Sequence, residues 1–138
     1  MNIDEIKNGI VIDHIKPGQA MEIYRFLGLD KLDCTVAIIK NATSRRMGKK
    51  DIIKIDSDIT QDLSVLGYID RESTVNIIKD GVVSSKYHPK LPLEIVNIIK
   101  CKNPRCITST EQELSHIFRL TDCKNAVYRC IYCESRAK

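Results

Sequence analysis

Residues 9–15 read Gly9-Ile10-Val11-Ile12-Asp13-His14-Ile15, a run of mostly β-branched side chains that predicts a β-strand. Pro17-Gly18 ends this strand, and apolar residues then recur at helical spacing between residues 20 and 27. Residues 34–39 and 51–55 predict two further strands, with a polar loop over residues 41–50 between them. The chain therefore begins as strand, helix, strand, strand.

Helices and strands continue to follow one another after residue 55. A short helix is expected over residues 60–66, followed by strands over residues 73–79 and 82–87. Asp80-Gly81 separates the last two strands and is a strong signal for a two-residue hairpin turn. The full order is strand, helix, strand, strand, helix, strand, strand. We therefore predict an α+β fold with a ferredoxin-like plan and an added hairpin strand.

Length and composition exclude several classes of protein. The chain has 138 residues, 43% of them apolar, which suits one domain with a small appendage and excludes wholesale disorder. No apolar run approaches the ~18 residues that span a bilayer, and the acidic start, residues 1–5, does not resemble a signal peptide. The net charge of +4 is too mild to indicate a nucleic-acid binder. We expect a cytoplasmic protein with neither a membrane nor a nucleic-acid partner.

Five of the six cysteines lie in the last 38 residues. Cys101 and Cys106 are separated by four residues, Cys130 and Cys133 by two, and 23 residues separate the two pairs. Two short knuckles of this kind aim four thiolates at one tetrahedral ion, which is typical of a closed structural zinc site rather than a catalytic one. A tail this short buries too little surface to fold alone, so metal binding would supply the folding free energy.

The remaining thiols and a nearby histidine are weaker candidates. Cys123 pairs with no other cysteine at knuckle spacing, so it is expected not to bind the metal and is either a buried small apolar group or a spare thiol. Cys34 opens a predicted strand, so packing is its expected role. His116 lies between the knuckles, but four cysteines leave it no vacant ligand position. The alternative for the whole set is redox-active or incidental thiols.

Several stretches together resemble the regulatory chain of aspartate carbamoyltransferase over essentially the whole chain. These stretches are residues 9–15, residues 47–55 (Met47-Gly48-Lys49-Lys50-Asp51-Ile52-Ile53-Lys54-Ile55), Thr74-Val75-Asn76, Leu91-Pro92, and the four-cysteine pattern with its 23-residue gap. The resemblance implies a non-catalytic regulatory subunit of pyrimidine biosynthesis. It also implies an allosteric nucleotide-binding domain over residues 1–98 and a zinc-binding domain over residues 99–138 that docks the catalytic chain.

The resemblance further implies regulatory dimers that link catalytic trimers, and CTP and ATP as effectors competing for one site in the first domain. By family position, the nucleotide pocket would be lined by Ile6, Asp13, His14, Lys54, Asn76, Val83 and Lys86. The chemistry is compatible, because triphosphates need cations such as Lys54 and Lys86, and ribose hydroxyls need an acceptor such as Asp13. Without the resemblance, a lysine such as Lys54 is more often a solvated strand residue than a ligand, and Asp13-His14 is as readily a strand-end ion pair as a pair of ligand contacts.

For the catalytic-chain contact, the resemblance points to the metal knuckles. Asn103 and Arg105 lie inside the first knuckle and Glu134 follows the second. A metal holds such loops rigid, so their polar side chains dock a partner with little loss of entropy. Taken alone, the three residues are as compatible with ordinary solvated surface.

Two other functions remain open at this stage. One is a zinc ribbon fused to a ferredoxin-like module that binds RNA through the basic residues Arg45-Arg46 and Lys49-Lys50. Strand-borne aromatic residues for base stacking are scarce, which weighs against it. The other is an enzyme with His14 or His88 as a base, but no nucleophile accompanies either histidine at a useful spacing.

Overall fold

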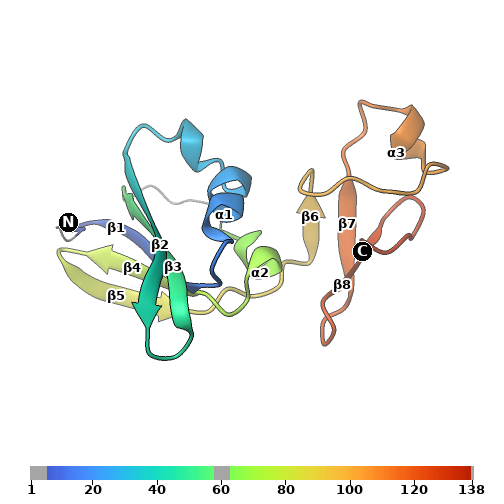
Figure 1. The fold of residues 1–138 in the computed structure, drawn as a ribbon. Helices are drawn as coiled ribbons and strands as arrows, with labels where there is room; N and C mark the ends of the chain where they lie inside the picture. Colours follow the sequence, from blue (N-terminus) through green and yellow to red (C-terminus); the bar gives the residue numbers. More distant parts are fainter. Residues whose placement is uncertain (1–5, 58–62, 138) are drawn as a thin grey trace. The chain divides into compact units, whose positions relative to one another are not determined.

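The computed structural model describes residues 6–57 and 63–137 (Figure 1). The chain divides into two compact units, Met1–Lys90 and Leu91–Lys138. This division falls earlier than the predicted boundary after residue 98, because residues 94–96 form a strand that pairs within the second unit. None of the helices in the described residues is both long and apolar enough to cross a lipid bilayer.

The first unit follows the order of strands and helices expected from the sequence. Its elements are β1 (Gly9–Ile15), α1 (Ala20–Phe26), the 3₁₀ turn η1 (Leu29–Lys31), β2 (Thr35–Ser44), β3 (Gly48–Asp56), α2 (Leu66–Ile69), β4 (Thr74–Lys79) and β5 (Val82–Tyr87). The five strands form one antiparallel sheet in the order β2-β3-β1-β4-β5.

Alternation along the strands gives this sheet one apolar face. Ile10 and Ile12 of β1 and Ile53 and Ile55 of β3 are buried and form one core cluster with residues of α1 and α2. Figure 1 shows both helices beside the same side of the sheet. We call the opposite side, which carries Val11 between those two isoleucines, the outer face. The helices do not cover it, so its side chains are available to a ligand.

Two local predictions differ from the structure. Residues 41–50 are not a loop, because β2 continues to Ser44 and β3 begins at Gly48, with a tight turn between them. A shift of register between Ile39 and Ala42 interrupts the apolar alternation there and explains why the sequence pattern ended early. The start of the helix expected over residues 60–66 lies outside the described residues, and the described helix runs from Leu66 to Ile69.

A buried carboxylate fixes the irregular parts of this sheet. Asp51 is fully buried, and its oxygens accept hydrogen bonds from the backbone N–H groups of Gly18 (3.0 Å), Ala20 (3.4 Å) and Asn41 (3.0 Å). These three groups belong to the β1–α1 connection, the first residue of α1 and the bulge of β2. One side chain therefore satisfies three backbone donors that the sheet and the helix leave unpaired.

The second unit is a small antiparallel sheet with two metal knuckles. It contains β6 (Glu94–Val96), α3 (Ile107–Thr110), β7 (Ile117–Asp122) and β8 (Val127–Cys130), in the sheet order β6-β7-β8. Its buried hydrophobic residues are few: Ile95, Cys106, Phe118, Val127, Tyr128 and Cys130. Two of these six are cysteines of the knuckles, so the core and the cysteine cluster are one structure.

Replacing Asp51 tests how far the first unit depends on this carboxylate. Asp51→Ala leaves three backbone N–H groups without their acceptor, and we expect the free energy of unfolding to fall by about 3–5 kcal/mol in urea denaturation followed by circular dichroism. Asp56→Ala, which removes an exposed carboxylate from the same strand, serves as the control and should change it by less than about 0.5 kcal/mol. Equal effects of the two substitutions would contradict this role for Asp51.

Candidate functional sites

The four predicted cysteine ligands come together in the second unit. The sulfur atoms of Cys101, Cys106, Cys130 and Cys133 all lie within 4.8 Å of one another. The Sγ atoms of Cys101 and Cys133 are 3.5 Å apart and those of Cys106 and Cys130 are 3.7 Å apart. A tetrahedral ion with metal–sulfur distances of ~2.3 Å requires sulfur–sulfur distances of about 3.8 Å, so the cluster has the size of a four-thiolate metal site.

The first knuckle is shaped by Asn103. Its side-chain oxygen accepts a hydrogen bond from the N–H of Arg105 (3.0 Å), and its carbonyl oxygen accepts from the N–H of Cys106 (3.0 Å) and the hydroxyl of Ser109 (2.9 Å). These bonds turn the chain so that Cys106 returns toward Cys101. Of the two predicted contact residues here, Asn103 is therefore partly engaged in holding the knuckle, whereas the side chain of Arg105 is exposed.

The second knuckle turns back on the end of β8. The N–H of Glu134 donates to the carbonyl of Cys130 (2.8 Å), and the N–H of Cys130 donates to the carbonyl of Ser135 (2.9 Å). Glu134 has a φ of 64°, a left-handed conformation that closes the turn, and it is exposed. The predicted contact residue Glu134 therefore lies on a backbone that the knuckle itself holds in place.

The thiols differ in acidity because their surroundings differ. Burial raises the pKa of Cys101 to about 12. Burial also acts to raise the pKa of Cys133, but hydrogen bonds from Ser135 and Asn103 outweigh it and bring this pKa down to about 6. Four thiolates at these distances repel one another strongly, so a full set of charges needs a cation at the centre. The donor set fits a soft divalent metal ion.

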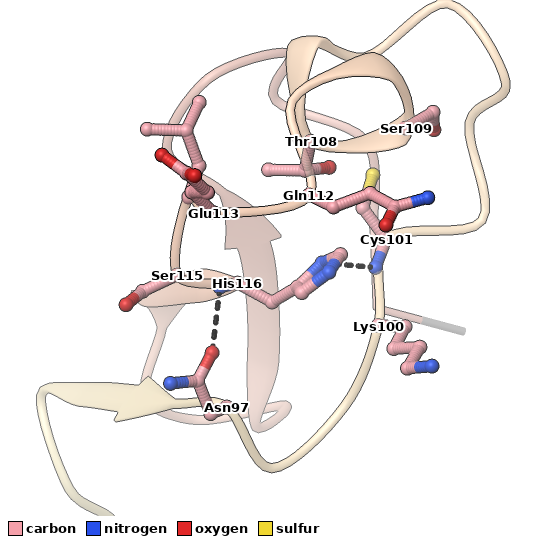
Figure 2. Close-up of a pocket in the computed structure, with 10 residues that line it drawn as sticks. Asn97, Lys100, Cys101, Thr108, Ser109, Gln112, Glu113, Ser115 and His116 are labelled. Carbon is pink, nitrogen blue, oxygen red and sulfur yellow. Dashed lines mark hydrogen bonds between the residues drawn. The ribbon is translucent and has the colours of Figure 1, made fainter.

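Further groups support the sulfurs from outside the cluster. The hydroxyl of Thr108, which is 4% exposed, donates to Sγ of Cys106 at 3.1 Å and lowers the pKa of that thiol. A polar pocket of about 660 Å³ lies beside Cys101. Figure 2 shows the residues that line it, among which Nδ1 of His116 accepts the N–H of Cys101 at 3.2 Å. Asn97 in turn accepts the N–H of His116 at 2.9 Å. His116 thus positions a ligand residue.

The other two cysteines stand apart from the cluster. Cys34 packs against the core of the first unit, and Cys123 is exposed near the β7–β8 turn. Neither belongs to the group of side chains that could hold a metal in the described residues.

Three of the residues expected at the nucleotide pocket lie in one row on the outer face of the first sheet. Val11 of β1 is paired with Lys54 of β3 on one side and with Asn76 of β4 on the other. Asn76 is in turn paired with Lys86 of β5. Directly paired residues project from the same side of a sheet, so two lysines flank an amide along a line perpendicular to the strands.

A bulge at the end of β1 brings Asp13 and His14 beside this row. The register of β1 against β3 shifts between Ile12 and Ile15, and His14 has a φ of 56°. The carboxylate of Asp13 accepts the N–H of His14 at 2.6 Å and forms an ion pair with Nζ of Lys50 at 3.0 Å. Nδ1 of His14 lies 3.2 Å from the hydroxyl of Thr74 on β4.

The electrostatics of this corner are dominated by cations. Burial lowers the pKa of His14, Asp13 acts to raise it, and the positive charges of Lys50, Arg46 and Lys86 lower it further. His14 is therefore a neutral ring at pH 7. Burial acts to raise the pKa of Asp13, but the hydrogen bonds from Lys50 and the N–H of His14 outweigh it, so the carboxylate stays ionised. A negatively charged ligand would meet several positive side chains here.

The last two predicted pocket residues lie near the opposite end of β1. Val83 of β5 is paired with Ile78 of β4, is 55% exposed and shares the outer face with Asn76. Ile6 lies close to Gly9. A Cβ atom at position 9 would stand 2.7 Å from the side chain of Ile6 and would collide with the carbonyl oxygen of Ile55. Glycine is therefore required at position 9 for the close approach of the chain.

Sequence reasoning missed several residues of both sites. Lys50, whose side chain is 17% exposed, was assigned to a loop, although it belongs to β3 and pairs with Asp13. Thr108 supports a sulfur, but a threonine two residues after a cysteine carries no distinctive signal. Alternation of polar and apolar residues across positions 48–56 was the one pattern that would have placed Lys50 on the outer face.

Comparison with known proteins assigns both units. Residues 1–90 match the family model of the aspartate carbamoyltransferase regulatory chain, allosteric domain, and residues 93–138 match that of the same chain's metal binding domain. The chain belongs to the aspartate carbamoyltransferase regulatory chain family. It is accordingly a regulatory chain and not a catalytic one.

Relatives named as aspartate carbamoyltransferase regulatory chains match along nearly the whole length. The chain is 48% identical to one from Clostridium botulinum (strain Hall) over 134 residues, which cover 97% of this chain and 92% of the relative. It is 46% identical to one from Clostridium tetani over 135 residues, 97% of this chain and 94% of the relative. A relative from Bifidobacterium longum is 41% identical over 138 residues, 100% of this chain and 99% of its own.

The hydrogen bond to Cys106 predicts that Thr108 strengthens metal binding. Thr108→Val keeps the shape of the side chain but removes the hydroxyl, and we expect the affinity for Co²⁺ or Zn²⁺ to fall by about tenfold. Competition with a chromophoric chelator measures this directly. Thr110→Val is the matched control, because the Thr110 hydroxyl donates to the carbonyl of Ile107 and not to a sulfur. If both variants bound metal as the wild type does, Thr108 would have no such role.

Proposed function

We propose that this chain is the non-catalytic regulatory subunit of aspartate carbamoyltransferase, which binds CTP and ATP on its first unit and docks catalytic chains through its second. The observation that carries the effector part is the row of Lys54, Asn76 and Lys86 across the outer face. Two lysines at fixed positions suit a triphosphate, and an amide between them suits a ribose or a base. Control of this kind requires each nucleotide to bind the low- and high-activity states of the complex unequally.

The proposed pocket residues contact different parts of the nucleotide. Lys86, with Lys54, meets the phosphates, supported by the positive surroundings of His14. Asp13 is ionised and still has acceptor capacity for ribose hydroxyls, although Lys50 occupies part of it. Ile6 contributes backbone groups to the base, and the exposed Val83 contributes apolar surface. The first unit would act as a ferredoxin-like nucleotide-binding module, in keeping with the order of its strands, β4-β1-β3-β2, with β5 added.

We propose one structural zinc ion bound by Cys101, Cys106, Cys130 and Cys133. The cluster leaves no open position for a substrate, and its size fits tetrahedral zinc. The bound metal would supply the positive charge that keeps all four sulfurs as thiolates and so fixes both knuckles. Reduced thiolates of this kind are typical of the cytoplasm, where we place the protein.

The knuckles would form the contact with the catalytic chain. Arg105 and Glu134 are exposed on backbone that the knuckles hold, and Asn103 shapes the first of them. Two apolar side chains of the same loops are also unusually exposed, Ile107 at 49% and Tyr132 at 41%. Rigid loops that carry both apolar and charged groups have the composition of a protein interface.

A regulatory dimer completes the proposal. β2 is one edge of the first sheet and is paired only with β3 among the described strands. Its residues 35–39 would pair with the same segment of a second copy across a two-fold axis, which would cover the unpaired backbone groups of the edge.

The RNA-binding alternative gains no support from the described strands. Of their aromatic side chains, Phe118 and Tyr128 are buried and Tyr87 is exposed at the far edge strand. Single-stranded RNA is usually bound by several stacked aromatic rings on one sheet face.

The effector site predicts that Lys86 contributes directly to nucleotide affinity. Lys86→Gln removes one cation of the row, and we expect the affinities for CTP and ATP to fall by about tenfold or more in isothermal titration calorimetry. Lys79→Gln is the matched control on the same hairpin, because residue 79 alternates to the other side of β4 and is exposed.

A second readout follows the charge of the ligand itself. Triphosphate near His14 favours the imidazolium, so CTP should raise the lowered pKa of His14 in an NMR titration. Equal losses of affinity in the two lysine variants, or an unmoved His14 pKa, would argue against this site.

The docking proposal predicts that assembly needs the metal and that nucleotide binding does not. We would mix purified catalytic trimers with the zinc-loaded chain, with a chain stripped by a thiol-reactive mercurial, and with a stripped chain reloaded with Zn²⁺. Light scattering should detect a large complex for the first and third samples only, because the knuckles lose their shape without the ion. CTP binding should persist in the stripped chain, since the first unit has its own core.

Two cysteine variants test by substitution whether assembly needs the metal site. Cys133→Ser removes a cluster sulfur and should abolish assembly, whereas Cys123→Ser leaves the cluster intact and should assemble like the wild type. Assembly of the stripped chain or of Cys133→Ser would refute the proposed docking role of the metal domain.

A further inference from the structure

Three arginines from distant parts of the sequence lie side by side in the second unit. Arg119 of β7 is directly paired with Arg129 of β8, and Arg129 forms a β-bridge with Arg136 near the end of the chain. On the other side of Arg119, the paired residue is Glu94 of β6. We call Arg119, Arg129 and Arg136 the arginine row. Paired residues project from the same side of a sheet, so the three guanidinium groups share one face.

This face is the exposed side of the small sheet. Phe118 and Cys130, which neighbour the arginines along β7 and β8, are buried on the opposite side, while all three arginines are exposed. The alternation of the strands therefore separates the metal-linked core from a positively charged outer surface.

The arginines of the row lie close together although their charges are alike. Like charges directly opposite each other on neighbouring strands repel, and here the repulsion occurs twice in succession. Within the described residues, no carboxylate comes within ion-pair distance of any of the three arginines. Among the described residues, the side chains of the row make one hydrogen bond, and its acceptor is a neutral group: Nη1 of Arg129 donates to the carbonyl of Glu134 at 3.1 Å.

The surroundings of the row suit a protein partner better than a nucleic acid. Val96, 48% exposed, and Ile117 form the next pair along β6 and β7 and give the face an apolar strip. On the far side, a polar hollow of about 750 Å³ is lined by Arg129 and Arg136 and by residues that include Asp122 and Asn125. Arginine beside exposed aliphatic groups is typical of protein interfaces, whereas nucleic-acid surfaces pair cations with exposed aromatic rings.

We infer that the arginine row docks a carboxylate-rich surface of the catalytic chain. Guanidinium groups bind carboxylates through paired hydrogen bonds. Glu94 beside Arg119 and Asp122 near Arg136 are carboxylates close to the row, but neither forms an ion pair with it among the described residues, so an acidic partner supplies the closer counter-charge. The row is continuous with the proposed knuckle contact, because Arg129 is bonded to the backbone of Glu134 in the second knuckle. This inference rests on the proposed docking function and adds an electrostatic contact to the contact made by the knuckles.

The test neutralises the row in the full, zinc-loaded chain. We would compare the wild type with a triple variant, Arg119→Gln, Arg129→Gln and Arg136→Gln, for binding to catalytic trimers over a range of salt concentrations. The control variant, Lys31→Gln, Arg71→Gln and Lys79→Gln, loses the same charge from exposed positions of the first unit. A third variant, with lysine at the three row positions, keeps the charge but loses the paired hydrogen bonds.

We expect the row variant to bind trimers about 100-fold more weakly than the wild type at low salt, with a shallower salt dependence. The control variant should stay within about twofold, and the lysine variant should fall between the two. Because neutralisation removes repulsion, the thermal midpoint of the row variant should equal or exceed that of the wild type.

The outcomes distinguish this inference from the function on which it rests. Failure of the wild-type chain to bind trimers would overturn the docking function itself. Unchanged trimer affinity in the row variant, with wild-type binding intact, would overturn the arginine row alone. A lowered thermal midpoint of the row variant would show that the row stabilises the fold. Loss of RNA binding by the row variant, with intact trimer binding, would assign the row to nucleic acid. Either result overturns the inference.

Discussion

Like charges held close together by the backbone are the constraint on which this structure depends. The clearest case is the cysteine cluster, whose four sulfurs lie within 4.8 Å of one another. As thiols they contribute little more than small apolar groups, and as thiolates they repel unless a cation lies between them. Besides the cluster cysteines Cys106 and Cys130, the second unit has four buried hydrophobic side chains among the described residues. A core of this size rarely stabilises a domain alone, so the counter-charge of the metal becomes part of the fold.

The same constraint recurs with the opposite sign on the outer face of the first sheet. Burial lowers the pKa of His14, and the positive charges of Lys50, Arg46 and Lys86 lower it further. Of these three cations, only Lys50 has a carboxylate partner within ion-pair distance among the described residues. The first unit does not need a counter-charge to fold, because its apolar core and the buried Asp51 hold the sheet. An anion bound there would therefore act as a ligand that shifts an equilibrium and not as a structural component.

The features that could be predicted from the sequence are those set by neighbouring residues, whereas features that depend on residues far apart in the chain could not be predicted. The cysteine pairs and the Asp80-Gly81 turn are local patterns, and the four sulfurs do cluster and the β4–β5 hairpin does form. The β2–β3 hairpin was missed because a bulge near Asn41 breaks the alternation, and that bulge is held by Asp51, ten residues away. The arginine row was invisible, since the pairing of Arg119, Arg129 and Arg136 depends on strand register.

These charge clusters also set limits on how the two units communicate. A nucleotide on the first unit alters docking of the second only if it binds the docked and free forms with different affinities. Reciprocity then requires that docking change the affinity for the nucleotide by the same factor. If the proposed ion holds both knuckles of the second unit, the folding of that unit is not available as the switch. The coupling must instead act through elements with two stable arrangements. The outer face of the first sheet, where His14 and Asp13 lie on a bulge among cationic side chains, is the part of the chain best suited to change with bound charge.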